Sequence, residues 1–200
     1  MSFFVQGLYR RRFQQTRCVT LSWNQPKVCG QISWGGVEMV RQMSLFSKKL
    51  PYKYIIDSSS IFSQKDNEPH RRTVYRGLWK RIEQLIQEKE IVTSSEIADE
   101  IKDKDLESWL QNQQCVILPV DESIQQNVTR VVSNNPKLVD FKQVKSSGDA
   151  FLIATAMEYH LTIITEENQD SPYKIPKVAE NMGVKAIDIN ELCQIEDWQF

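Results

Sequence analysis

Four acidic side chains are the strongest candidates for chemistry in this sequence, because each is expected where a strand ends or in the opening turns of a helix. They are Asp57, Glu100, Asp149 and Glu167. Carboxylates that are brought together repel one another and raise each other's pKa values, so such a group persists only where cations neutralise it. Oxygen ligands without Cys or His select hard ions, Mg²⁺ or Mn²⁺. One or two such ions would orient and deprotonate a water molecule for in-line attack on a phosphodiester.

Three of these acids also have a competing interpretation. Asp57 is equally consistent with the N-cap of a helix, and Asp149 with an acid that complements a helix dipole. Glu166 and Glu167 are adjacent, so only one of them can point into a site at the end of a strand. Their spacing does not choose between them.

Glu100 lies in a predicted helix that offers two other acids, Glu96 and Asp99. An acid on a helix is usually solvated. Glu100 is three residues after Ile97 and directly before Ile101, which places it at the edge of the apolar face of this helix. That position favours Glu100 over Asp99 as a site residue.

The elements expected to position these acids alternate between short β-rich runs and amphipathic helices. Strands are predicted at 52–56, 91–92, 115–118, 162–165 and 184–187, and helices at 74–89, 95–101, 106–110, 121–134, 148–159 and 178–182, with Asp188 capping a last helix. This alternation implies right-handed crossovers, and therefore a three-layer α/β/α fold with a mainly parallel central sheet. Ligands of such sheets bind beyond the carboxyl ends of the strands, where the four acids fall.

The charge of the chain is unevenly distributed. Residues 1–50 hold 8 of the 25 Lys and Arg residues but one of the 26 acids, Glu38, so the remainder of the chain is acidic. An acidic domain cannot attract a polyanion through its overall field. If the substrate is RNA, binding must therefore depend on local basic patches and on bound cations.

Residues 1–50 show no sustained strand or helix period, and Pro51 marks the boundary to a domain over residues 51–200. The first segment is predicted to be a flexible extension, a partner-docking segment or an upstream in-frame translation. The 4 cysteines are scattered without a CxxC pair, which signals neither a zinc site nor a disulfide framework. There is no apolar run of membrane-spanning length and no secretory pattern at the start, so the expected location is the cytoplasm.

Three segments resemble the successive acidic motifs of the PIN-domain superfamily. They are YIIDSSSIF, IVTSSEIADEI and SGDAFLIATAMEYHLTIITEE. The pieces GLWKRI, LESWL, SGDAFLIATA and KIPKVA are similar to a PIN-like branch of bacteria and archaea that is related to VapC-type toxins. The resemblance covers nearly all of residues 51–200 and none of residues 1–50.

The resemblance implies a Mg²⁺-dependent (or Mn²⁺-dependent) endoribonuclease, often the toxin of a type II toxin-antitoxin pair and often a homodimer. Its partners would be an RNA substrate and a cognate antitoxin protein. Metal ligation and catalysis would fall to the four acids named above, with Ser59 and Thr165 in support. Two features depart from the superfamily pattern: the first motif is Asp-Ser-Ser where Asp-Thr-Asn is common, and Glu167 stands where Asp is common.

A basic group beside the first long helix is a candidate RNA contact, with Arg71, Arg72 and Arg76 as its main members. A solvated helix face explains the same residues. Ser59 argues against a phosphatase of the haloacid-dehalogenase type, which needs a second acid at that position. The chain also lacks the paired acids that a receiver domain requires. The alternative that stays open is a non-catalytic PIN-like module that binds an antitoxin partner or RNA.

Overall fold

The computed structural model describes residues 50–136, 138 and 148–200. The predicted N-terminal extension lies outside this described part, apart from Leu50, and its role stays a prediction. No helix in the described ranges is long and apolar enough to cross a membrane.

Five short parallel strands form the central sheet, in the order β3-β2-β1-β4-β5. They are β1 (Tyr54–Ile56), β2 (Ile91–Ser94), β3 (Val116–Leu118), β4 (Thr162–Ile164) and β5 (Ala186–Ile187). The chain builds outward from β1 to β3 and then returns to β4 on the other side of β1. The region beyond the carboxyl ends of β1 and β4 is thus the switch point at which such sheets place ligands.

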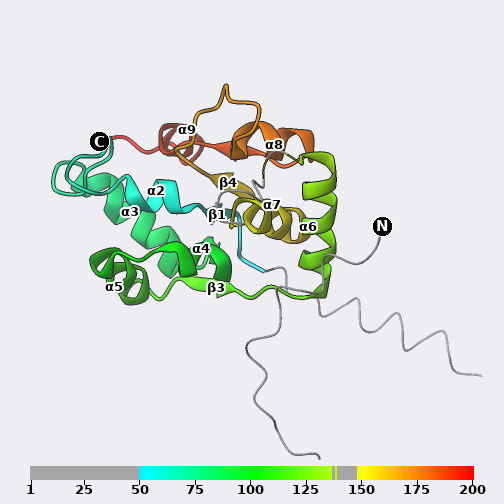
Figure 1. The fold of residues 1–200 in the computed structure, drawn as a ribbon. Helices are drawn as coiled ribbons and strands as arrows, with labels where there is room; N and C mark the ends of the chain where they lie inside the picture. Colours follow the sequence, from blue (N-terminus) through cyan, green and yellow to red (C-terminus); the bar gives the residue numbers. More distant parts are fainter. Residues whose placement is uncertain (1–49, 137, 139–147) are drawn as a thin grey trace, which may run out of the picture. The chain divides into compact units, whose positions relative to one another are not determined.

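Helices cover both faces of this sheet, as Figure 1 shows. Tyr54 and Ile56 of β1 pack into one apolar cluster, and Ile55 packs into the other, because successive side chains of a strand point to opposite faces. One face carries α3 (Arg76–Gln87), α5 (Lys104–Asn112) and α9 (Ile189–Ile195), and the other carries α6 (Glu122–Asn134), α7 (Gly148–Tyr159) and α8 (Ile175–Asn181). The predicted three-layer α/β/α fold with a parallel sheet is confirmed.

Side-chain caps explain where several helices begin. Ser94 caps α4 (Ser95–Glu100) by accepting from the backbone N of Ile97. Asp121 caps α6 by accepting from the backbone N of Ile124. Asp188 caps α9 in a capping box: its side chain accepts from the backbone N of Glu191, and the Glu191 side chain accepts from the backbone N of Asp188. Two backbone N–H groups that would otherwise be unpaired at this helix end thus have partners.

Other element boundaries differ from the sequence prediction. A short helix, α2 (Ser58–Phe62), begins after Asp57, where a helix was expected only under the N-cap interpretation of that residue, and α8 begins three residues earlier than expected. Five residues are too few for helical periodicity to show in a sequence, so only the cap signal of Asp57 could have indicated α2. Trp79 and Trp109 are core residues, with ring centroids 5.7 Å apart at an interplanar angle of 85°.

Candidate metal and catalytic site

Asp57 stands at the carboxyl end of β1 and is only 2% exposed. Its Oδ2 atom accepts hydrogen bonds from the Ser59 backbone N at 3.3 Å, the Ser59 Oγ at 2.5 Å and the Thr165 Oγ1 at 3.0 Å. Its Oδ1 atom is buried and has no hydrogen-bond partner among the described residues. Burial raises the pKa of this carboxyl, and the charge of Glu167 raises it further.

The bond from the Ser59 backbone makes Asp57 the N-cap of α2, so the capping interpretation of this residue is correct. The same side chain nevertheless keeps one oxygen without a donor. A capping role and a ligand role are therefore compatible, because the two oxygens of one carboxylate have different surroundings.

Ser59 links the ends of β1 and β4. Its Oγ lies 3.1 Å from the Thr165 Oγ1 and accepts from the backbone N of Glu166 at 3.0 Å, in addition to donating to Asp57. The two predicted supporting residues, Ser59 and Thr165, thus both contact the carboxylate that they were predicted to support.

The Ser59→Ala substitution is expected to lower the free energy of unfolding by about 1–3 kcal/mol, because it leaves the Glu166 N–H without its acceptor and removes a donor from Asp57. The neighbouring Ser58→Ala substitution removes only a 3.4 Å contact to Glu100, and it is expected to cost less than about 0.5 kcal/mol. Urea unfolding followed by tryptophan fluorescence measures both. Equal costs would contradict the proposed linking role of Ser59.

Glu100 is the last residue of α4 and faces Asp57. The charge of Asp57 is, after burial, the main cause that raises the pKa of the Glu100 carboxyl. The Ser58 hydroxyl donates to its Oε2 at 3.4 Å, and its Oε1 is buried without a partner in the described part of the chain. The pKa of Glu96 is raised by burial and by Asp99 instead. Among these three acids, Glu100 is the one that the structure brings to Asp57.

Asp149 lies in the first turn of α7, where its helix-dipole interpretation places it as well. Burial raises its pKa to about 7, and the charges of Glu167, Asp57 and Glu100 contribute in that order, while Lys174 opposes the shift. The backbone of Gly148, the preceding residue, hydrogen-bonds the Glu100 carboxyl. The charges of all three other acids therefore act on Asp149, and the four predicted side chains lie in the same region of the structure.

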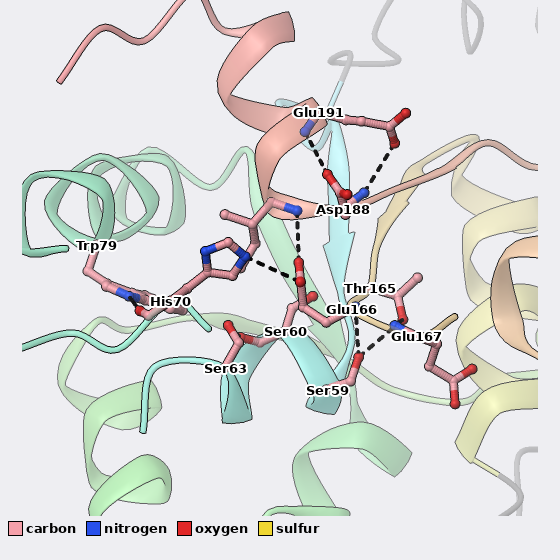
Figure 2. Close-up of polar contacts among 11 residues, drawn as sticks. Ser59, Ser60, Ser63, His70, Trp79, Thr165, Glu166, Glu167, Asp188 and Glu191 are labelled. Carbon is pink, nitrogen blue, oxygen red and sulfur yellow. Dashed lines mark hydrogen bonds and ion pairs between the residues drawn. The ribbon is translucent and has the colours of Figure 1, made fainter. Parts of the chain in front are cut away.

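Glu166 and Glu167 point in different directions, as Figure 2 shows. The Glu166 carboxylate accepts from the backbone N of Ile189 at 2.9 Å and lies 3.3 Å from the His70 Nε2, so it is used at the start of α9. Glu167 is the acid whose charge acts on Asp57 and Asp149. The structure thus makes the choice between two neighbours that the sequence spacing left open.

Both carboxylate oxygens of Glu167 already have partners. Its Oε1 forms an ion pair with the Lys174 Nζ, and its Oε2 accepts from the backbone N of Ile175 at 2.9 Å, the first residue of α8. Lys174 is a site residue that the sequence did not identify. The run KIPKVA gave no sign of it, because the contact depends on a turn that brings residue 174 back to residue 167.

The donor set fits a hard divalent cation. All four groups offer oxygen, and the buried, unpartnered Oδ1 of Asp57 and Oε1 of Glu100 are atoms that a cation would satisfy. In the described residues, however, no three His, Cys, Asp or Glu side chains are arranged closely enough to hold a metal ion as they stand. The convergence is looser than the predicted pocket, and metal ligation stays a prediction.

The arginines of the basic group that was predicted to contact RNA have different surroundings in the structure. Arg72 forms an ion pair with Glu83 and lies over the Trp109 ring at 5.8 Å, so it stabilises the contact between α3 and α5. Arg71 and Arg76 are exposed and remain candidates for contacting RNA. His70 pairs with Glu166 rather than with any of the four acids.

Comparisons with known proteins give a family and a group of similar folds. Residues 54–200 match the model of a family described as Domain of unknown function (DUF4411). No curated protein matches the chain. FitAcB from Neisseria gonorrhoeae is similar in fold, with 16% sequence identity, 68% of this chain and 97% of that chain covered, and a TM-score of 0.43.

Two further solved structures are similar to the same extent. PAE2754 from Pyrobaculum aerophilum is 13% identical, with 74% of this chain and 98% of that chain covered and a TM-score of 0.44. The DNA-bound VapBC from Salmonella typhimurium is 15% identical, with 69% and 98% covered and a TM-score of 0.45. At these identities the similarity concerns the fold alone.

Proposed function

The chain belongs to the family described as Domain of unknown function (DUF4411), and within this family we propose that it acts as a metal-dependent endoribonuclease of the PIN type. One observation carries the proposal. Asp57, although 2% exposed, keeps a buried oxygen without a partner in the described ranges, at the point where the charges of three other acids meet. A buried carboxylate oxygen without a donor is costly, and a divalent cation removes that cost.

The four acids would share the ion unequally. Asp57 and Glu100 each offer a buried free oxygen, and Asp149 stands beside them with a pKa raised to about 7. Mg²⁺ usually keeps several waters and needs only one or two carboxylates, so a closed cage of four is not required. Glu167 would join as a ligand only after leaving Lys174.

The bound cation would supply an activated water and stabilise charge on the phosphate. The protein's own residues do the positioning. Ser59 and Thr165 fix the Asp57 carboxylate through its Oδ2, which directs Oδ1 away from these donors. Asp149, which lies beside these acids, would accept the proton of the attacking water.

The resemblance to VapC-type sequences supports a toxin role in a type II toxin-antitoxin system. A cognate antitoxin protein and a second copy of the chain would then be partners, besides the RNA substrate. A small DNA-binding protein encoded next to this chain would support that role.

The test is RNA cleavage by the purified wild-type protein. We expect cleavage of single-stranded RNA with Mg²⁺ or Mn²⁺ and none after chelation with EDTA, because the acids cannot approach a phosphate without a cation. Gel analysis of end-labelled RNA gives the rate and the cleavage sites. Cleavage that persists in EDTA, or none with either ion, would contradict the proposal.

A non-catalytic module is the second candidate, and the engagement of Glu167 favours it. Both oxygens of this acid already have partners in Lys174 and the backbone of Ile175. If these contacts never open, the protein would bind RNA or an antitoxin without cutting. Tight RNA binding without cleavage in the same assay would select this function.

A further inference from the structure

Lys174 brings a positive charge into the acidic site. Its ammonium pairs with the Glu167 carboxylate, and its pKa is raised first by that hydrogen bond and then by the charges of Glu167, Asp149 and Asp57. The ammonium contacts the Glu167 carboxylate beyond the end of β4, and the charges of Asp57 after β1 and Asp149 at the start of α7 also act on it. Its side chain is 42% exposed, so the ammonium can also be reached from solvent.

A second lysine, inside the helix that Lys174 precedes, shows what an ordinary surface ion pair looks like in this protein. Lys177 is three residues further along, is 47% exposed and pairs with Glu180. Its pKa is raised by Glu180 and Asp170, neither of which is one of the four acids. The two lysines are similar in exposure and lie three residues apart, but they differ in their charged neighbours.

Lys174 would lose its partner when a metal ion binds Glu167. An ammonium without a counter-charge next to a divalent cation is unfavourable, and a phosphate oxygen is the partner that would relieve it. The predicted substrate carries that group. The lysine also favours the approach of RNA to the site, because four carboxylates repel RNA and the positive charge of the lysine offsets part of that repulsion.

We propose that Lys174 holds a phosphate of the RNA substrate beside the metal-binding acids, and that the Glu167 carboxylate keeps its ammonium in place until a metal ion takes over that carboxylate. This inference rests on the proposed nuclease function and adds a substrate-positioning residue to it. In the absence of RNA, Lys174 and the metal ion compete for Glu167. In its presence, the lysine and the ion bind the substrate together.

Two measurements on Lys174→Met test the proposal, with Lys177→Met as the matched control. Isothermal titration with Mn²⁺ alone is expected to show binding tighter by roughly 3- to 10-fold in Lys174→Met, because one competing positive charge is gone. Cleavage of a short single-stranded RNA with Mn²⁺ is expected to show KM raised by about 10-fold with kcat changed much less, since one charge-assisted phosphate contact is lost. Lys177→Met should match wild type in both.

Two further variants separate positioning from a structural role. Lys174→Arg keeps the charge and is expected to recover most of the KM. Lys174→Gln keeps a hydrogen-bond donor toward Glu167 without the charge, so it is expected to behave as Lys174→Met does, and it replaces that variant if the methionine form does not fold. The slope of the logarithm of RNA affinity against the logarithm of salt concentration should become shallower by about 0.7 in the uncharged variants, because one phosphate contact is removed.

The outcomes distinguish the two proposals. A KM and a salt slope that are unchanged in both uncharged variants, or an equal loss in Lys177→Met, would overturn the role of Lys174 while leaving the nuclease function standing. A wild-type protein that neither binds Mn²⁺ nor cuts RNA would overturn the nuclease function and this inference with it.

Discussion

The Asp57→Asn and Asp149→Asn variants are each expected to cut RNA at least about 100-fold more slowly than wild type, because disturbing even an outer partner of a metal ligand costs 10- to 100-fold. The asparagine amide keeps the size of the side chain but removes the charge that a divalent cation requires. In Asp57→Asn the hydrogen bonds to Oδ2 can be kept by the amide oxygen, so the fold should survive. Initial rates at saturating Mn²⁺, with circular dichroism as the folding check, measure the effect.

The adjacent pair of glutamates provides the matched control for this prediction. Glu167→Gln removes the acid whose charge reaches Asp149, whereas Glu166→Gln changes a side chain that contacts His70 and the start of α9. We expect a substantial loss of cleavage in Glu167→Gln and a rate close to wild type in Glu166→Gln. The opposite order, or full activity in Asp149→Asn, would show that these acids are not the nuclease site.

Metal-free protein is expected to lose stability as the pH rises from about 4 to about 7. Asp149 has a pKa of about 7 in the folded protein against a model value of 3.8. Between these values the folded state binds more protons than the unfolded state, so the free energy of unfolding falls with rising pH. Below the window the group is protonated in both states and above it is ionised in both. The raised pKa values of Asp57 and Glu100 act in the same direction.

Mn²⁺ or Mg²⁺ should reverse this loss. A ligand at about 100 times its Kd stabilises the folded state by about 2.7 kcal/mol. Asp149→Asn should raise the stability of the metal-free protein at about pH 8 by roughly 2 kcal/mol, after allowance for its partial exposure, and should remove most of the response to metal. Urea unfolding at several pH values, with and without Mn²⁺, measures both. Stability that rises with pH in metal-free protein would contradict the clustering of these charges.

Sequence patterns alone determined the architecture of the domain. Apolar runs such as residues 91–92 and the cap residues Asp121 and Asp188 indicate strands and helix starts locally, because a short apolar run is typical of a buried strand and a cap needs only a neighbouring N–H. The apolar helix that Gly148 and Asp149 open was predicted to end at Tyr159, where the structure ends it. The start of α8 was placed three residues late, although Pro176 in its first turn is a local start signal.

The tertiary structure decided which side chains share a place. Sequence spacing left Glu166 and Glu167 equivalent. In the folded chain Glu166 accepts from the backbone N of Ile189 at the start of α9, whereas Glu167 accepts from the backbone N of Ile175 at the start of α8 and lies near the other acids. Lys174 entered the site in the same way. Propensity and periodicity act between residues near in sequence, whereas charge, burial and hydrogen bonding in a site depend on distances in space, which only the folded chain fixes.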